Sequence, residues 1–170
     1  MNVIMYFAMT LNGKIADAKD SIAFSSDNEW NLFEEKVKEW GNIIMGSRTF
    51  EISCRAKVFP YSGINVVMTS KNIKNVWGDR VIFFGGSPAE ALKMLKERGF
   101  ETAYVGGGGR LNYSFLKEGL VDEVMIDIEP EILGKGIGLL SDEDIRSKLK
   151  LIEVKKISED EVQLRYSVIR

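Results

Sequence analysis

The sequence contains no histidine and only one cysteine, and these two shortages exclude several kinds of enzyme chemistry. Without histidine, the chain cannot form a Ser-His-Asp triad, a Cys-His pair or the usual catalytic zinc site. A single thiol, Cys54, permits neither an internal disulfide nor a cysteine metal cluster. Because no base accompanies it, we interpret Cys54 as a small apolar residue. Any catalysis must depend on carboxylates, hydroxyls, lysines or a bound cofactor, and we expect no metal site.

Strong charge of one sign and long apolar runs are also missing. The 23 basic and 25 acidic residues give a net charge of −2, which offers no general attraction for nucleic acid or anionic lipid. The longest apolar runs, such as residues 3–9, are far shorter than the roughly 20 residues that span a bilayer. The N-terminus lacks the basic flank and small-residue cleavage site of a signal peptide. We therefore expect a cytoplasmic protein with neither a nucleic-acid nor a membrane partner.

We predict one domain over residues 1–170, because no linker, repeat or low-complexity segment divides the chain. A polar, glycine-containing loop is expected from Thr10 to Ser25. Short apolar runs on either side of such segments are predicted to be strands. These runs are residues 2–9, 42–45, 64–68, 81–84, 102–105 and 121–129.

Helix signals lie between these predicted strands. Ser26 and Ser87 each begin an S-x-x-E sequence, which is the form of a capping box at a helix start. Behind Ser26, apolar residues at helical spacing predict a helix as far as about Glu39. The helix behind Ser87 is predicted to end at Gly99, and a short helix is expected over residues 111–117.

The C-terminal part has a different pattern. Residues 151–157 and 162–169 are strand-like, and a polar segment connects them, so we predict an antiparallel hairpin. The preceding alternation of strands and helices is typical of a parallel sheet. The predicted fold class is therefore α/β, with a mixed, mostly parallel central sheet and a C-terminal antiparallel hairpin.

Four consecutive glycines, Gly106–Gly109, lie between a predicted strand and a predicted helix. They do not form the dinucleotide fingerprint, because G-x-G-x-x-G begun at Gly106 or Gly107 would need glycine in place of Leu111 or Asn112. They do not form a P-loop either, since no G-K-S/T ends the run. A strand-to-helix turn needs fewer glycines, so we predict that this run lets the backbone approach a ligand.

Two further loops follow predicted strands and combine hydroxyl groups with a cation. They are Gly46-Ser47-Arg48-Thr49 and Thr69-Ser70-Lys71. Each loop alone could simply be solvated, but both have the groups that hold phosphate oxygens. Because open α/β sheets bind ligands at the carboxyl ends of their strands, these loops and the glycine run together favour a nucleotide.

Asp27 is the carboxylate of greatest interest, since it lies in the first turn of the first predicted helix. The helix dipole alone would explain an acid at that place. The alternative is an acid that faces a cleft beside Trp30, where burial would have to keep the proton on a catalytic acid. For two glycine-containing loops, the sequence leaves two interpretations. The loop around Gly13 is either the hinge of a lid or a turn, and residues 134–138 form either a flexible loop or a ligand contact.

These motifs, in this order, resemble the dihydrofolate reductase superfamily. MTLNGKIA (residues 9–16) is similar to the opening motif of its riboflavin-pathway pyrimidine reductases, the branch of the deaminase-reductase C-terminal domain. GGGGRLNYSFLKEGLVDEV (106–124) and PEILGKGIGLL (130–140) are similar to the C-terminal signature of that branch. NIIMGSRTFE (42–51) and VVMTSK (66–71) resemble the segments of dihydrofolate reductases that hold the 2′-phosphate and pyrophosphate of NADPH. The resemblance covers residues 1–140.

The resemblance implies a three-layer α/β/α fold, a homodimer, and hydride transfer from NADPH to a pyrimidine or pterin-like substrate. It assigns the adenosine end and its phosphates to Gly46, Ser47, Arg48, Thr49, Thr69, Ser70 and Lys71. It assigns the pyrophosphate and nicotinamide region to Gly107, Gly108, Gly109, Arg110 and Leu111, and the border of the nicotinamide to Ala8, Ile15 and Ala16. Asp27 matches the catalytic carboxylate that dihydrofolate reductases place against the pterin ring of their substrate. Met5, Trp30 and Phe50 are expected on the substrate side.

The sequence departs from both branches near the expected substrate. Residues 23–26 replace the proline-tryptophan element that precedes the acid in dihydrofolate reductases. Residues 53–57 stand where riboflavin-pathway reductases commonly carry Asn-Asp-Pro and Leu-Thr-x-Arg elements. The leading hypothesis is NADPH-dependent reduction of a ribosylaminopyrimidine 5′-phosphate to its ribitylamino form. A dihydrofolate reductase, favoured by Asp27 and Trp30, and a non-catalytic nucleotide-binding module are the alternatives.

Overall fold

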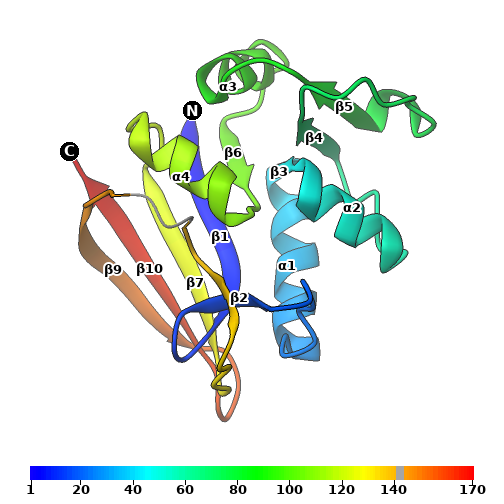
Figure 1. Cartoon of the computed structure of the whole chain (residues 1–170). Coiled ribbons are helices and arrows are strands. Elements are labelled where there is room, and N and C mark those ends of the chain that lie inside the picture. Colours follow the sequence, from blue (N-terminus) through cyan, green and yellow to red (C-terminus); the bar gives the residue numbers. More distant parts are fainter. Residues whose placement is uncertain (141–143) are drawn as a thin grey trace.

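An eight-stranded sheet forms the centre of the computed structural model, which describes residues 1–140 and 144–170 (Figure 1). Its strands lie in the order β5-β4-β3-β6-β1-β7-β10-β9. In chain order they are β1 (Asn2–Thr10), β3 (Asn42–Gly46), β4 (Ile64–Met68), β5 (Val81–Phe84), β6 (Thr102–Val105), β7 (Glu123–Glu129), β9 (Lys148–Lys156) and β10 (Val162–Ile169). Neighbouring strands from β5 to β7 are parallel, whereas β10 is antiparallel to both β7 and β9. The predicted mixed sheet with its C-terminal hairpin is confirmed.

Helices cover both faces of this sheet. On one face, α1 (Asp27–Trp40) and α2 (Ser47–Arg55) bury Phe33 and Phe50 in one hydrophobic cluster. On the other face, α3 (Pro88–Glu97) and α4 (Gly109–Lys117) bury Leu95 and Phe115 in a second cluster. A 3₁₀ turn, η1 (Gly78–Arg80), precedes β5. The expected three-layer α/β/α architecture is therefore confirmed.

Helix α1 is capped at both ends and buries one row of side chains against the sheet. It begins after Ser26, whose hydroxyl accepts a hydrogen bond of 3.0 Å from the backbone N–H of Glu29. It ends at Gly41, which has the left-handed conformation that favours glycine, with φ 71°. The buried residues of the helix, Glu29, Phe33 and Val37, are four positions apart and lie on one face. Glu29 therefore belongs to the buried stripe of α1.

A second, two-stranded sheet joins β2 (Lys14–Asp17) to β8 (Gly136–Gly138) in antiparallel fashion. The sequence patterns predict loops for both segments. Their strand character depends on pairing between residues far apart in sequence, which no local pattern indicates. A Cβ atom at Gly136 would lie 2.6 Å from the carbonyl oxygen of Ala16, so glycine permits this close approach. In this way the segment after β1 and the segment after β7 form one wall beside the main sheet (Figure 1).

Most predicted element boundaries agree with the structure to within two residues, and the start of β9 at the sheet edge is an exception. Helix α4 begins at Gly109 inside the glycine run, two residues before the predicted start at Leu111. Strand β9 begins at Lys148, three residues before the predicted start. No helix in the described part of the chain is long and apolar enough to cross a membrane.

Candidate active site

A cavity of about 620 Å³ lies at the carboxyl ends of β3, β4 and β6. Gly46, Met68 and Gly106 stand at these strand ends or directly after them, and all three line the cavity. The first turns of α1, α2 and α4 and the small β2–β8 sheet form the remaining walls. Open α/β sheets bind ligands at this edge, and the volume suits a small molecule. The cavity is therefore the candidate active site.

The N-termini of α2 and α4 meet at this cavity with glycine at both N-caps. Within the described residues, no side chain accepts a capping hydrogen bond at the start of either helix, because the N-cap residues are Gly46 and Gly108. Helices α1 and α3, by contrast, are capped by the hydroxyls of Ser26 and Ser87. The first-turn N–H groups of α2 and α4 therefore lack side-chain acceptors and can donate to an anion in the cavity.

The glycine run holds these two helix starts together. The backbone N–H of Gly46 donates to the carbonyl of Gly107 at 2.9 Å, and that of Gly106 donates to Ile44 at 2.8 Å. A Cβ atom at Gly106 would lie 2.7 Å from the Ile43 side chain, and Gly107 has φ +91°. The Gly107–Gly108 peptide bond is cis. Glycine is therefore needed at Gly106 for space and at Gly107 for conformation.

Most residues assigned to the cofactor line this one cavity. They are Ala8, Ile15, Ala16, Gly46, Ser47, Arg48, Thr49, Gly107, Gly108, Gly109, Arg110 and Leu111. Thr69, Ser70 and Lys71 do not line it and border a separate hollow of about 750 Å³ instead. The Lys71 ammonium lies 3.2 Å from the Glu51 carboxylate on the protein surface. The structure thus brings two of the three predicted phosphate loops together.

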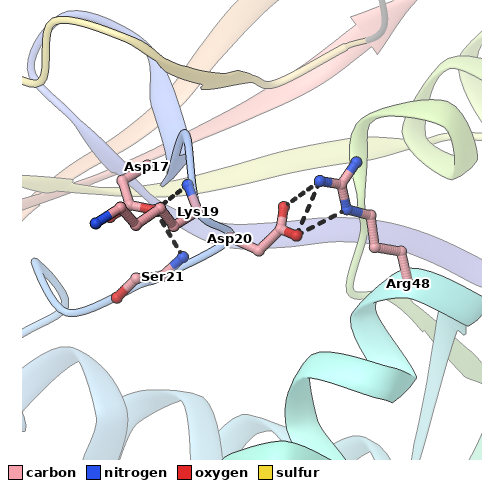
Figure 2. Close-up of polar contacts among 5 residues, drawn as sticks. All are labelled: Asp17, Lys19, Asp20, Ser21 and Arg48. Carbon is pink, nitrogen blue, oxygen red and sulfur yellow. Dashed lines mark hydrogen bonds and ion pairs between the residues drawn. The ribbon is translucent and has the colours of Figure 1, made fainter.

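Arg48 is ion-paired with Asp20 at the cavity wall (Figure 2). The guanidinium Nε and Nη2 donate to Asp20 Oδ2 at 3.0 Å and 2.8 Å, and Nη2 lies 2.6 Å from Oδ1. Asp20 has a left-handed backbone, with φ 67°. Its turn is held by Asp17, whose Oδ1 accepts hydrogen bonds from the backbone N–H groups of Lys19 and Ser21 (Figure 2). The predicted phosphate-binding arginine therefore contacts an internal carboxylate.

Of the three residues expected on the substrate side, only Trp30 lines the cavity. Its ring stacks on Phe33, with centroids 5.2 Å apart. Met5 is fully buried in the core under α3 and α4, because its side chain points to the opposite sheet face. Phe50 is buried among Phe59 and other aromatic rings under α2. Met5 and Phe50 therefore do not line this cavity.

The structure does not bring Asp27 to the cavity, whereas Glu29, two residues later on α1, lines it. Asp27 is exposed, whereas Glu29 is only 4% exposed. The physical reason is helix geometry, because two residues correspond to about 200° of rotation. Burial raises the pKa of Glu29 to about 8, and the negative charges of Asp127 and Glu129 contribute to the rise. The Glu29 carboxyl group therefore keeps its proton at neutral pH.

Further acidic groups surround Glu29 on the side away from the cavity. Burial raises the pKa of Glu129 to about 7 and also raises that of Asp127. Asp127 accepts hydrogen bonds from the Tyr6 hydroxyl at 2.6 Å and from Gln163 at 2.8 Å. No group of three or more acidic, histidine or cysteine side chains among residues 1–140 and 144–170 is arranged to hold a metal ion. The cluster instead keeps Glu29 among like charges, which favours its neutral form.

The sequence patterns did not single out four of the cavity residues, namely Glu29, Asn112, Asp20 and Tyr104. Glu29 had a usable signal, since it extends the Phe33 and Val37 stripe by one helical step. Asn112 and Asp20 gave none, because their place at the cavity depends on the turn that each segment adopts. Tyr104, whose hydroxyl donates to the Tyr6 carbonyl at 2.9 Å, could have been found from its place one residue before the end of a buried strand.

Comparison with known proteins gives consistent results. The model of the RibD C-terminal domain family matches residues 1–163. Among curated proteins, YwjB of Bacillus subtilis, itself uncharacterized, is 29% identical over 171 residues, covering 96% of this chain and 95% of YwjB. A 2,5-diamino-6-ribosylamino-4(3H)-pyrimidinone 5′-phosphate reductase of Methanothermobacter thermautotrophicus is 26% identical, covering 78% of this chain and 79% of its own.

The arrangement of the chain also matches solved structures. A protein of Shewanella sp. PV-4 that is named for riboflavin biosynthesis superposes with a TM-score of 0.83. The match covers all of both chains, at 24% sequence identity. At that identity the likeness shows the fold alone.

Proposed function

Because the chain belongs to the RibD C-terminal domain family, we propose that it is an NADPH-dependent reductase of a ribosylaminopyrimidine 5′-phosphate, which it converts to the ribitylamino form. The substrate class is that of the archaeal relative named as such a reductase. The proposal includes a single reductase domain over residues 1–170 and a homodimer. The observation that carries it is the meeting of two glycine-capped helix N-termini with a buried carboxyl group, Glu29, at one cavity.

The groups at the cavity suit a dinucleotide with a pyrophosphate. The first turns of α2 and α4 line the same cavity and have no side-chain cap, so their N–H groups can donate to neighbouring phosphate oxygens. Arg48 and Arg110 add positive charge at the two helix starts. A Cβ atom at Gly108 would lie 3.5 Å from the Thr49 hydroxyl, so a side chain there would fill the space between the two turns. The residues present therefore fit NADPH.

In the reduction the bond between C1′ and the ring oxygen of the sugar breaks. C1′ receives one hydride, which NADPH supplies when bound, and the former ring oxygen receives one proton and becomes a hydroxyl. Glu29 is the proton donor in this proposal, because its carboxyl group lines the cavity and stays protonated at neutral pH. Trp30 and Phe33 provide an apolar wall that excludes water from the reacting atoms. Ala8, Ile15 and Ala16, which line the cavity, border the nicotinamide ring in the same proposal.

Dihydrofolate reduction is the second candidate, and the acid on α1 favours it. The carboxyl group of Glu29 faces the cavity beside Trp30, which is the relation expected of an acid against a pterin ring. A non-catalytic nucleotide-binding module is the third candidate. Such a module would use the glycine run but would have no use for a protonated acid in the cavity.

One assay separates the three candidates. Purified protein is incubated with NADPH and either the ribosylaminopyrimidine 5′-phosphate or dihydrofolate, and the oxidation of NADPH is followed by absorbance. We expect oxidation with the pyrimidine phosphate alone. Oxidation with dihydrofolate alone would establish the second candidate. NADPH binding without oxidation in either mixture would favour the binding module.

Glu29→Gln tests the proton donor. Because glutamine cannot supply a proton, we expect turnover to fall by about a hundredfold or more while the dissociation constant of NADPH stays the same. Asp27→Asn is the matched control, since Asp27 lies on the same helix turn but is exposed and away from the cavity. Equal loss in both variants would mean that the helix start, and not the acid, matters for turnover.

Cofactor preference tests the phosphate contacts at the start of α2. If Ser47 and Arg48 hold the 2′-phosphate, NADPH raises the melting temperature more than the same concentration of NADH, because a ligand stabilises the fold according to its affinity. Arg48→Ala should remove most of this difference. Equal shifts with the two cofactors in the wild-type protein would contradict the assignment of the 2′-phosphate to these residues.

A further inference from the structure

Asn112 is fully buried at the cavity wall, and its side-chain amide has a hydrogen-bonded nitrogen and an oxygen without a partner among the described residues. It lies in the first turn of α4 and lines the cavity. Its side-chain nitrogen donates to the carbonyl oxygen of Leu139 at 2.9 Å. Its side-chain oxygen, Oδ1, has no hydrogen-bond partner among the described residues. A buried acceptor without a donor costs free energy, so its persistence here requires an explanation.

Rotation of the amide does not solve this problem. The Leu139 carbonyl can only accept, so the atom of Asn112 that faces it must be the donor nitrogen. Exchange of the amide nitrogen and oxygen would place Asn112 Oδ1 against the Leu139 carbonyl oxygen, and both of these atoms are acceptors. The amide nitrogen would then take the position that has no protein partner. The oxygen of Asn112 is therefore fixed on the side away from Leu139.

Two other buried side-chain oxygens in the described part of the chain lack a hydrogen-bond partner, and their surroundings differ. Asp20 Oδ1 lies 2.6 Å from the Arg48 guanidinium, so a positive charge compensates it. Glu129 Oε1 does not line the cavity and belongs to the acid cluster behind Glu29. Asn112 differs from both, because it is neutral and lines the cavity.

The surroundings of Asn112 indicate which kind of ligand atom it meets. A Cβ atom at Gly107 would lie 3.8 Å from Asn112 Oδ1 and 3.9 Å from Asn112 Nδ2, so the amide group lies beside the glycine turn. A phosphate oxygen at this point would be repelled, because both atoms are acceptors at neutral pH. The Leu139 bond ties Asn112 to the β8 side of the cavity, where Ile137 and Leu140 also form the wall. That wall is paired with β2, which carries Ile15 and Ala16.

We propose that Asn112 Oδ1 accepts a hydrogen bond from the carboxamide N–H of the bound nicotinamide. The inference rests on the proposed function, in which Ile15, Ala16 and the glycine turn border the nicotinamide end of the cofactor. The carboxamide NH₂ is a donor at that end and supplies the hydrogen that Asn112 Oδ1 lacks. Asn112 then acts as a specificity residue, which fixes the orientation of the carboxamide and ties it to the β8 wall.

The test compares NADPH with its 3-acetylpyridine analogue, in which a methyl group replaces the carboxamide NH₂. Dissociation constants of both are measured by titration calorimetry, which does not require turnover. We expect the wild-type protein to bind NADPH roughly five- to tenfold more tightly than the analogue, as one neutral hydrogen bond predicts. Asn112→Leu should weaken the binding of NADPH to the level of the analogue and leave the affinity for the analogue nearly unchanged.

Tyr113→Phe is the matched control, because Tyr113 is the next residue of α4 and does not line the cavity. It should preserve the preference for NADPH. If Asn112→Leu loses its cooperative thermal transition, Asn112→Ser replaces it with a smaller polar side chain. The comparison of the two cofactors on the wild-type protein needs no variant and stands in either case.

Three results would overturn the inference. Equal binding of the two cofactors by the wild-type protein would mean that the carboxamide N–H makes no net contribution. If Asn112→Leu weakened the binding of both cofactors by the same factor, the residue would act only through Leu139. If Asn112→Leu left NADPH binding unchanged and raised the KM of the pyrimidine substrate, the hydrogen-bond donor would belong to the substrate. Failure of the wild-type protein to bind either cofactor would instead contradict the proposed function itself.

Discussion

Glu29 shows how the surroundings of one residue set its chemistry. Its backbone N–H takes part in the cap of α1, while its side chain turns away from that cap into the cavity. At Ser87, the corresponding Glu90 completes the reciprocal capping box with its side chain. The two S-x-x-E sequences therefore have different outcomes, because one glutamate lies on a buried helix face and the other on an exposed one.

The raised pKa of Glu29 predicts a dependence of stability on pH. In the unfolded chain a glutamate titrates near pH ~4.3, whereas in the folded protein Glu29 titrates near pH 8. Between these values the folded state holds a proton that the unfolded state lacks. The contribution of Glu29 is therefore complete below about pH 4 and is lost as the pH rises through 8, with a slope of up to about 1.4 kcal/mol per pH unit.

Urea unfolding of the wild-type protein and of Glu29→Gln between pH 5 and pH 8 measures this effect. The free energy of unfolding of the variant should fall less steeply with pH than that of the wild-type protein. Asp27→Asn should keep the wild-type slope, because Asp27 is exposed. Parallel curves for the wild-type protein and Glu29→Gln would mean that Glu29 is ionised in the folded state.

The candidate site could be predicted from sequence wherever the backbone itself forms it. The glycine run was predicted to let the backbone approach a ligand, and it lies at the cavity with Gly46 and Ser47. Side chains were harder to place, since the dipole argument for Asp27 depends on sequence position and not on helix face. The buried stripe through Phe33 and Val37 would have identified Glu29 instead.

At the scale of elements, the turn at residues 17–21 controls access to the arginine of α2. Asp17 fixes the turn through two backbone N–H groups, and Asp20 then reaches Arg48 across the cavity wall (Figure 2). The side-on edge of the guanidinium, Nε and Nη2, is occupied by this carboxylate. A phosphate that needs the same edge must compete with Asp20.

Asp20→Asn tests this competition. The variant removes the negative charge, so we expect adenosine 2′,5′-bisphosphate to bind several-fold more tightly in titration calorimetry at low salt. Glu51→Gln is the matched control, because Glu51 is also paired with a surface cation, Lys71, but lies outside the cavity. Weaker binding to Asp20→Asn would show that the turn helps to hold the ligand and does not compete with it.

The elements themselves were predictable where the signal is local. Strands β4, β5, β6 and β10 have the predicted boundaries, because each is a short apolar run between polar segments. Strands β2 and β8 were expected to be loops, since their pairing joins segments far apart in sequence and includes two glycines. Such a pair has no signal within either segment, so sequence patterns alone could not predict this wall of the cavity.

At the scale of the whole molecule, the sheet is asymmetric at its C-terminal edge. All residues of β9 are exposed, and among residues 1–140 and 144–170 β9 has a strand neighbour on one side only (Figure 1). Leu149, Leu151 and Val154 are 41%, 50% and 58% exposed. They pair with Val168, Tyr166 and Leu164 of β10, so the three apolar side chains lie on one face of the hairpin. This face is where the proposed homodimer would form.

The double variant Leu151→Lys/Val154→Lys tests the homodimer. Two charges on this face should convert a dimer, with about twice the 19.2 kDa of the chain, to a monomer in size-exclusion chromatography with light scattering. Ile132→Lys is the control, since Ile132 is 72% exposed but lies outside the hairpin. A monomeric wild-type protein, or a dimer that survives the double variant, would contradict the role of this face.

The meeting of α2 and α4 has a practical consequence for the choice of buffer. The N-termini of both helices, which are the positive ends of their dipoles, lie at the same cavity. The hydrogen bond from the Gly46 N–H to the Gly107 carbonyl keeps the two N-termini together. Such an arrangement attracts any small dianion, not only the phosphates of a nucleotide. Sulfate or inorganic phosphate in solution would then raise the melting temperature and weaken the measured affinity for NADPH. Affinities for this protein are therefore best compared in buffers of monovalent anions.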